Sequence, residues 1–183
     1  MNEELKQKIG IKGEITAKAY NQESLSFFEK LWNKFVIFFN LNKKKWYILG
    51  KLAWVDTKQN IICNAGLNAI CKRLDGDNTY GGEIDYMALG TGTPTPVVGD
   101  TTLDTEAYRN ATASGTDSAN VIYLTAYYTE AECNGTYTEF GNFIDGTAAA
   151  DSGQLWSHIA SISWVKDAVT VLVVDCKYTF ESI

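Results

Sequence analysis

The sequence has few of the residues that build common chemical sites: one histidine, two prolines and four cysteines among 183 residues. The single histidine, His158, excludes metal sites made of several histidines. Proline is scarce and glycine does not recur at a regular spacing, which excludes collagen-like and proline-rich chains. Cys63, Cys71, Cys133 and Cys176 form no C-x-x-C pair. We therefore expect free, buried thiols and neither a zinc ribbon nor a thioredoxin-type site.

The sequence also lacks a long apolar run. Its most apolar stretch, residues 35–41, is far shorter than the ~20 residues that a membrane span requires. The first ten residues, MNEELKQKIG, are too polar for a signal peptide. We therefore expect no membrane span, and synthesis in the cytoplasm.

No group of residues has a convincing catalytic or cofactor-binding pattern. Gly90–Thr93 is followed by Pro94 and not by a helix with a Lys-Ser/Thr pair, which argues against nucleotide binding. His158 lies in a predicted strand without a G-x-S-x-G elbow, and we expect it on a sheet surface. Glu130 and Glu132 resemble a glycosidase pair, but their loop context predicts solvated side chains. We predict no catalytic, cofactor-binding or metal-binding residues and therefore no enzyme.

Charge is unevenly divided along the chain, whose formal net charge is −6. Residues 1–76 contain 13 basic and 7 acidic residues, whereas residues 77–183 contain 3 and 15. This asymmetry favours head-to-tail contacts between copies, or docking of the basic part on an acidic partner. The densest basic run, Lys43–Lys45, is more typical of a solvated face than of a phosphate site, so we expect no nucleic acid partner.

An aromatic segment near the N-terminus is the most unusual local feature. After a predicted strand at Ile9–Tyr20, a helix is predicted from Ser24, as its N-cap, to Leu41. This helix has three interpretations: it covers its own sheet, inserts into a neighbouring subunit, or lies at a membrane surface. Residues 35–39 are apolar nearly all round and need cover on more than one side, which favours oligomerisation.

The rest of the chain predicts one β-rich domain. A short helix is expected at Asn64–Leu74, with Asn64 as its N-cap and Asp75-Gly76 as its end. Residues 81–183 alternate about six short apolar strands with turns, a pattern typical of an antiparallel sandwich. We predict a mainly β fold, an antiparallel β-sandwich with one short helix and the N-terminal aromatic amphipathic helix. Its segments are an interface segment, 1–45, and a sandwich domain, 46–183.

The order of several short motifs carries a resemblance. The motifs are Asn64–Leu67 (NAGL), Tyr86–Pro94 (YMALGTGTP), Asp100–Leu103 (DTTL), Glu106 and Arg109, Gly135–Phe143 (GTYTEFGNF) and Leu155–His158 (LWSH). Together they resemble a group of small structural proteins of tailed bacteriophages, described as tail-fibre, baseplate or other virion components. The resemblance spans roughly residues 61–180 and implies a β-sandwich that assembles into a virion. Phe140–Phe143 departs from the family's commoner apolar run, and the aromatic helix stands where relatives usually have a turn.

These observations predict a non-enzymatic virion protein of the tail, neck or fibre, or alternatively a capsid decoration or head-fibre protein. We expect it to form homo-oligomers and to bind other virion proteins through its aromatic helix. The expected interface residues are the large apolar side chains of this helix: Phe27, Phe28, Leu31, Trp32, Phe35, Phe38 and Phe39.

A second hypothesis is a receptor- or carbohydrate-binding module of the virion. Sugars stack on exposed aromatic rings, and Tyr123, Tyr127 and Trp156 are the candidate ligand-facing residues. The partner would then be a glycan of the host surface. An alternative interpretation is that these rings cover the sheet or a subunit interface.

Overall fold

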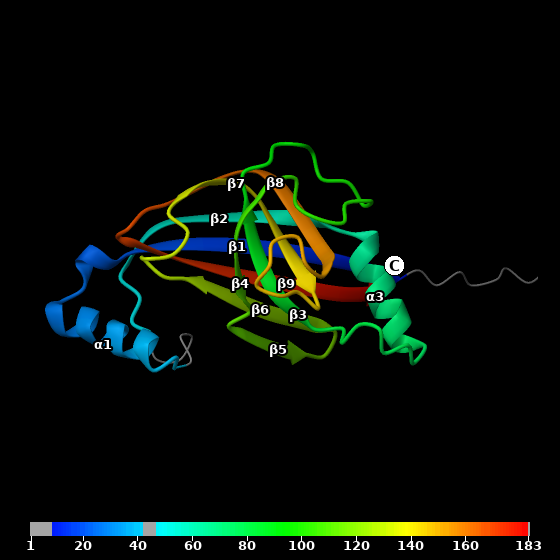
Figure 1. Ribbon diagram of the computed structural model, residues 1–183, viewed down its shortest axis with the longest axis horizontal. Coiled ribbons are helices and arrows are strands. Elements are labelled where there is room, and N and C mark those ends of the chain that lie inside the picture. Colours follow the sequence, from blue (N-terminus) through cyan, green and yellow to red (C-terminus); the bar gives the residue numbers. More distant parts are fainter. Residues whose placement is uncertain (1–8, 42–46, 183) are drawn as a thin grey trace, which may run out of the picture.

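The computed structural model describes residues 9–41 and 47–182, which form a strongly curved, mainly β structure with two α-helices (Figure 1). The strands are β1 (Ile9–Asn21), β2 (Lys51–Ile62), β3 (Ile84–Gly90), β4 (Glu106–Ala111), β5 (Ser114–Ser118), β6 (Val121–Tyr128), β7 (Gly135–Ile144), β8 (Gln154–Lys166) and β9 (Thr170–Ser182). The helices are a 3-10 turn η1 (Gln22–Ser24), α1 (Phe27–Phe38) and α3 (Asn64–Leu74).

The strands are antiparallel neighbours in one sheet with the order β4-β3-β7-β8-β2-β1-β9-β6-β5. The mainly β prediction is confirmed, but the sheet is a curled half-barrel and not the expected sandwich of two sheets. The reason lies in β2, which pairs with β1 over most of its length. At the end of β2, Ile61 and Ile62 pair with His158 and Ser157 of β8. This pairing joins the strands on the two sides of β2 into one continuous sheet, whereas a sandwich would have two separate sheets.

The predicted N-terminal strand is confirmed, and it lies in the middle of the sheet. β1 pairs with β2 on one side and with β9 on the other. Its alternation places Ile15 and Ala17 in the core, whereas Lys18 on the opposite face forms an ion pair with Asp175. Residues 9–21 are thus an integral part of the sheet. The expected segment boundary between residues 45 and 46 lies outside the described residues.

The concave face of the curled sheet holds the main core. Its largest fully buried side chains include Trp156, Trp164, Tyr128 and Tyr178. The hydroxyl of Tyr128 donates to the carbonyl of Met87 at 2.9 Å, which satisfies one buried polar group. The four cysteines are free; Cys63 and Cys176 are buried as expected, whereas Cys133 is half-buried and Cys71 is exposed.

The predicted short helix is confirmed as α3, with a different cap. Cys63 is the N-cap residue and its side chain makes no capping hydrogen bond, so Asn64 is the first helical residue. The end is as predicted: Asp75 is the C-cap, and Gly76 follows with a positive φ of 90°. Gly66 allows the helix to lie directly on β8, because a Cβ at this position would be 2.6 Å from the Cα of Trp156.

Candidate functional site

Helix α1 begins two residues after the expected position. Ser26 is its N-cap, and a reciprocal capping box links Ser26 to Glu29: the Ser26 N–H donates to the Glu29 carboxylate at 2.8 Å. Ser24, the predicted cap, instead lies in η1, where its hydroxyl donates to the carbonyl of Asn21. The S-x-x-E pattern explains the difference, because only Ser26 has a glutamate three residues later.

A polar side chain, Asn33, joins α1 to the segment that precedes β2. Asn33 is 2% exposed, and its amide Nδ2 donates to the carbonyl of Ile48 at 2.8 Å. The Ile48 N–H donates to Asn33 Oδ1 at 2.8 Å, so the Asn33 side chain forms a pair of hydrogen bonds with the backbone of Ile48. One turn further along, Val36 is fully buried in a small cluster with Tyr47 and Tyr127. The face of α1 that contacts the protein is therefore narrow and partly polar.

The aromatic side chains of α1 lie on the other side, in solvent. Phe38 is 81% exposed, Phe28 78% and Phe27 74%. Leu31, Trp32, Phe35 and Phe39 are also exposed, and the Phe35 and Phe39 rings contact each other with centroids 4.4 Å apart. The interpretation that this helix covers its own sheet is therefore wrong for these seven residues. We call this set (Phe27, Phe28, Leu31, Trp32, Phe35, Phe38 and Phe39) the aromatic face.

The aromatic face is placed at one end of the molecule. In Figure 1, α1 lies at the left end, and α3 lies at the opposite end. A groove of ≈ 280 Å³ runs beside the helix and is lined by Phe27, Leu31 and Lys34 together with Val169, which precedes β9. Lys30 and Lys34 border the aromatic face. The arrangement can bind an apolar surface of another molecule, since large apolar patches on soluble proteins mark interaction sites.

His158 is buried and not on a sheet surface, contrary to the expectation. Its Nδ1 lies 2.8 Å from Asp100 Oδ2, and its Nε2 lies 3.0 Å from Glu139 Oε2. Glu139 is 1% exposed and also accepts the backbone N–H groups of Gly92 and Thr105, each at 2.8 Å. This cluster fastens the loop between β3 and β4 to the sheet. This structural role accounts for the burial of His158 and Glu139.

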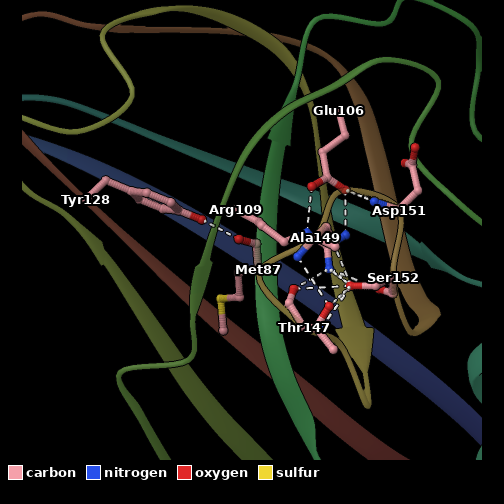
Figure 2. A network of polar contacts seen from close by, with 8 residues as sticks. All are labelled: Met87, Glu106, Arg109, Tyr128, Thr147, Ala149, Asp151 and Ser152. Atoms are coloured by element: carbon pink, nitrogen blue, oxygen red, sulfur yellow. Dashed lines mark hydrogen bonds and ion pairs between the residues drawn. The ribbon is translucent and has the colours of Figure 1, made fainter.

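A buried ion pair between Glu106 and Arg109 fastens another loop (Figure 2). Arg109 Nε and Nη2 donate to the two oxygens of Glu106, each at 2.6 Å, and both side chains are almost fully buried. Arg109 Nη1 donates to the carbonyls of Thr147 at 3.1 Å and Ser152 at 3.0 Å, which fixes the loop between β7 and β8. All three guanidinium nitrogens thus donate within the protein.

The candidate ligand-facing aromatics have three different environments. Tyr123 is 42% exposed, as a stacking platform requires, but Tyr127 is 8% exposed beneath α1 and Trp156 is 1% exposed in the core. The expectation of a surface platform is therefore wrong for Tyr127 and Trp156. The loop acid Glu130 accepts a hydrogen bond from the Tyr47 hydroxyl at 2.6 Å, and burial together with Glu130 raises the pKa of Tyr47.

Two important residues gave little signal in the sequence. Asn33 is a polar residue in an apolar helix, and Glu139 is a lone charge in an otherwise apolar and polar-neutral strand. Each such interruption is a sign of a buried polar contact. Their partners are far away in sequence, so the sequence did not identify them.

Within residues 9–41 and 47–182 the structure contains no group of three or more His, Cys, Asp or Glu side chains arranged to hold a metal ion. The helices of this described part are too short or too polar to cross a membrane.

Comparison with known proteins gives no relative. No protein-family model matches the sequence, and neither a curated protein nor a solved structure is significantly similar to the chain.

Proposed function

We propose that this chain is a non-enzymatic structural protein of a bacteriophage virion, and that its copies assemble through the aromatic face of α1. The observation that supports assembly is the outward orientation of that face, held by Asn33 and Val36 on the opposite side. The virion assignment rests on the motif order, which resembles tailed-phage structural proteins. A place in the tail, neck or fibre is proposed, with a capsid decoration or head fibre as the alternative.

The size of the aromatic face suits a stable protein interface. With the areas typical of such side chains, its exposed parts add up to about 800 Å². One partner of a standard protein–protein interface contributes about 800 Å². A second copy of the chain presents the same apolar face, and identical faces can bury one another about a symmetry axis. A second copy is therefore the occupant that we propose.

The mass of the full chain in solution tests this proposal. Sedimentation velocity at micromolar concentrations should give an oligomer for the parent chain. A variant with Phe28→Ser and Phe38→Ser should be monomeric, because central aromatic residues each contribute about 2–4 kcal/mol to an interface. Leu74→Ser is the matched control, since Leu74 is 83% exposed on α3 at the other end of the molecule.

A monomeric parent chain would show that the aromatic face does not join copies. Binding of that monomer to phospholipid vesicles, lost in the double variant, would favour the membrane-surface interpretation instead. The virion assignment is tested separately by mass spectrometry of purified phage particles. A fixed copy number per particle is the expected result, and absence from the particles contradicts it.

A further inference from the structure

The end of β8 carries a buried lysine without a charged partner. Lys166 is the last residue of β8 and is 2% exposed. Its Nζ donates to Asn134 Oδ1 at 3.0 Å and to the backbone carbonyl of Asp167 at 3.3 Å. Both acceptors are neutral oxygens, and among the described residues no carboxylate forms an ion pair with Lys166. A lysine that is buried as an ammonium ion normally has such a partner.

This environment favours the neutral amine. Burial lowers the pKa of Lys166 and outweighs the opposing electrostatic effects of Cys133, Glu130, Glu132 and Asp167. The neutral amine has a free electron pair, so a lysine that is desolvated in this way is an activated nucleophile. The side chain that lies against this nucleophile is the carboxamide of Asn134.

The sheet holds the Asn134 carboxamide beside the amine. Asn134 directly precedes β7, and the next residue, Gly135, pairs with Lys166 between β7 and β8. The electrophilic carbon, Asn134 Cγ, is bonded to the oxygen that accepts the hydrogen bond, so Nζ needs only a small movement to reach it. Two groups held together in this way react far faster than free molecules do. Asn134 is an exposed residue, which gives a leaving group access to solvent.

We propose that Lys166 and Asn134 join in an intramolecular isopeptide bond. The electron pair of Lys166 Nζ attacks Asn134 Cγ and forms the Nζ–Cγ bond. The Cγ–Nδ2 bond breaks, and its electron pair stays on Nδ2. Nδ2 takes up the proton that Nζ loses and leaves as ammonia. The product is a secondary amide; nothing is oxidised or reduced, and no co-reactant is consumed.

This bond joins residues that are 32 positions apart and fastens the turn before β7 to the end of β8. A covalent link of this kind constrains the unfolded chain as a disulfide does. It needs no pair of cysteines, and the four cysteines of this chain are free. The modification is separate from assembly through the aromatic face and uses other residues.

The intact mass of the full chain tests the proposal. After incubation at mildly alkaline pH, the parent chain should be lighter than its sequence mass by one molecule of ammonia. Lys166→Met keeps an unbranched side chain without a nucleophile, and Asn134→Ala removes the electrophile, so both variants should keep their full mass. Lys51→Met is the matched control at an exposed position and should lose ammonia as the parent does.

A competing reaction also releases ammonia. In an Asn-Gly pair, the backbone nitrogen of Gly135 can attack Asn134 Cγ and form a succinimide. Gly135→Ala separates the two reactions, because a side chain at this position hinders the succinimide and leaves Lys166 in place. A Cβ fits here, since the nearest neighbouring atom is the Tyr137 hydroxyl at 3.5 Å. The isopeptide bond therefore predicts that Gly135→Ala still loses ammonia.

Peptide mapping of the parent chain locates the bond without any variant. Trypsin should not cleave after Lys166, and tandem mass spectrometry should identify one branched peptide that contains both Asn134 and Lys166. A parent chain that keeps its full mass and is cleaved after Lys166 overturns the proposal. Ammonia loss that Lys166→Met retains and Gly135→Ala abolishes marks the succinimide and overturns it as well.

Discussion

At the scale of single residues, Asn33 and Asp85 show opposite consequences of burying a polar group. Asn33 gains two backbone partners from Ile48, so its burial fixes the orientation of α1 at little cost. Asp85 gains one backbone partner, since its Oδ1 accepts the N–H of Gly146 at 2.8 Å. Burial outweighs this hydrogen bond and raises the pKa of Asp85.

Asp85 should therefore make stability depend on pH. A carboxyl group whose pKa is higher in the folded than in the unfolded state lowers stability as pH rises from about 3.9, its unfolded value, through the folded value. Asp85→Asn retains an acceptor for Gly146 and removes this ionisation. It should raise the free energy of unfolding at pH 7, and the difference should disappear at pH values below the unfolded pKa.

Urea unfolding of the parent and the variant across this pH range measures the effect. Asp117→Asn, on the exposed edge strand β5, is the control and should change little. A lower stability of Asp85→Asn at pH 7 would show that the charged form of Asp85 stabilises the fold.

At the scale of elements, helix propensity and packing conflict at Gly66 of α3. Alanine favours a helix over glycine by about 1 kcal/mol. A Cβ at Gly66, however, would be 2.6 Å from the Cα of Trp156 and 3.1 Å from the carbonyl of Leu155, and a backbone contact of this kind cannot be relieved by a rotamer change. The close approach of α3 to β8 therefore requires glycine here.

Gly66→Ala should destabilise the protein by about 1–3 kcal/mol, because overpacking outweighs the gain in propensity. Asn68→Ala, an exposed position of the same helix, should be neutral or slightly stabilising. Thermal unfolding of the two variants, side by side, checks the difference. Equal or higher stability of Gly66→Ala would show that α3 moves away from β8 at little cost.

At the scale of the whole molecule, Glu139 joins residues that are far apart in the chain. Its carboxylate accepts the N–H groups of Gly92, Asp104 and Thr105 and contacts His158 of β8. Both ends of the loop between β3 and β4 are thereby fixed to the neighbouring strands. The loop in turn covers a cluster that includes Leu103 on the outer face of the sheet.

Glu139→Gln should lower the free energy of unfolding by about 2–4 kcal/mol. The amide nitrogen cannot accept a hydrogen bond, so at least one buried N–H loses its partner. Glu23→Gln makes the same change at an exposed position and serves as the control. Denaturant unfolding gives the free energies, and hydrogen exchange at residues 91–105 shows whether the loop opens first. An unchanged stability would mean that the cluster is dispensable.

The local pattern of the sequence determined the strands, the position of α3 and the existence of an aromatic helix near residue 30. These features depend on alternation, capping residues and turns within a few positions, which short-range sterics and hydrogen bonding control. The sequence also placed these seven large apolar residues together on one side of the helix. It did not determine whether that side faces the protein or the solvent.

The tertiary structure decided that orientation, because Asn33 pairs with Ile48 and Val36 enters a cluster with Tyr47 and Tyr127, contacts that no local pattern encodes. It also decided the closure of the sheet, through the pairing of the last residues of β2 with β8. The Glu139 cluster and the contact between Lys166 and Asn134 likewise gather residues separated by dozens of positions. Their positions follow from how the curled sheet and its loops pack together, and packing is a property of the whole chain.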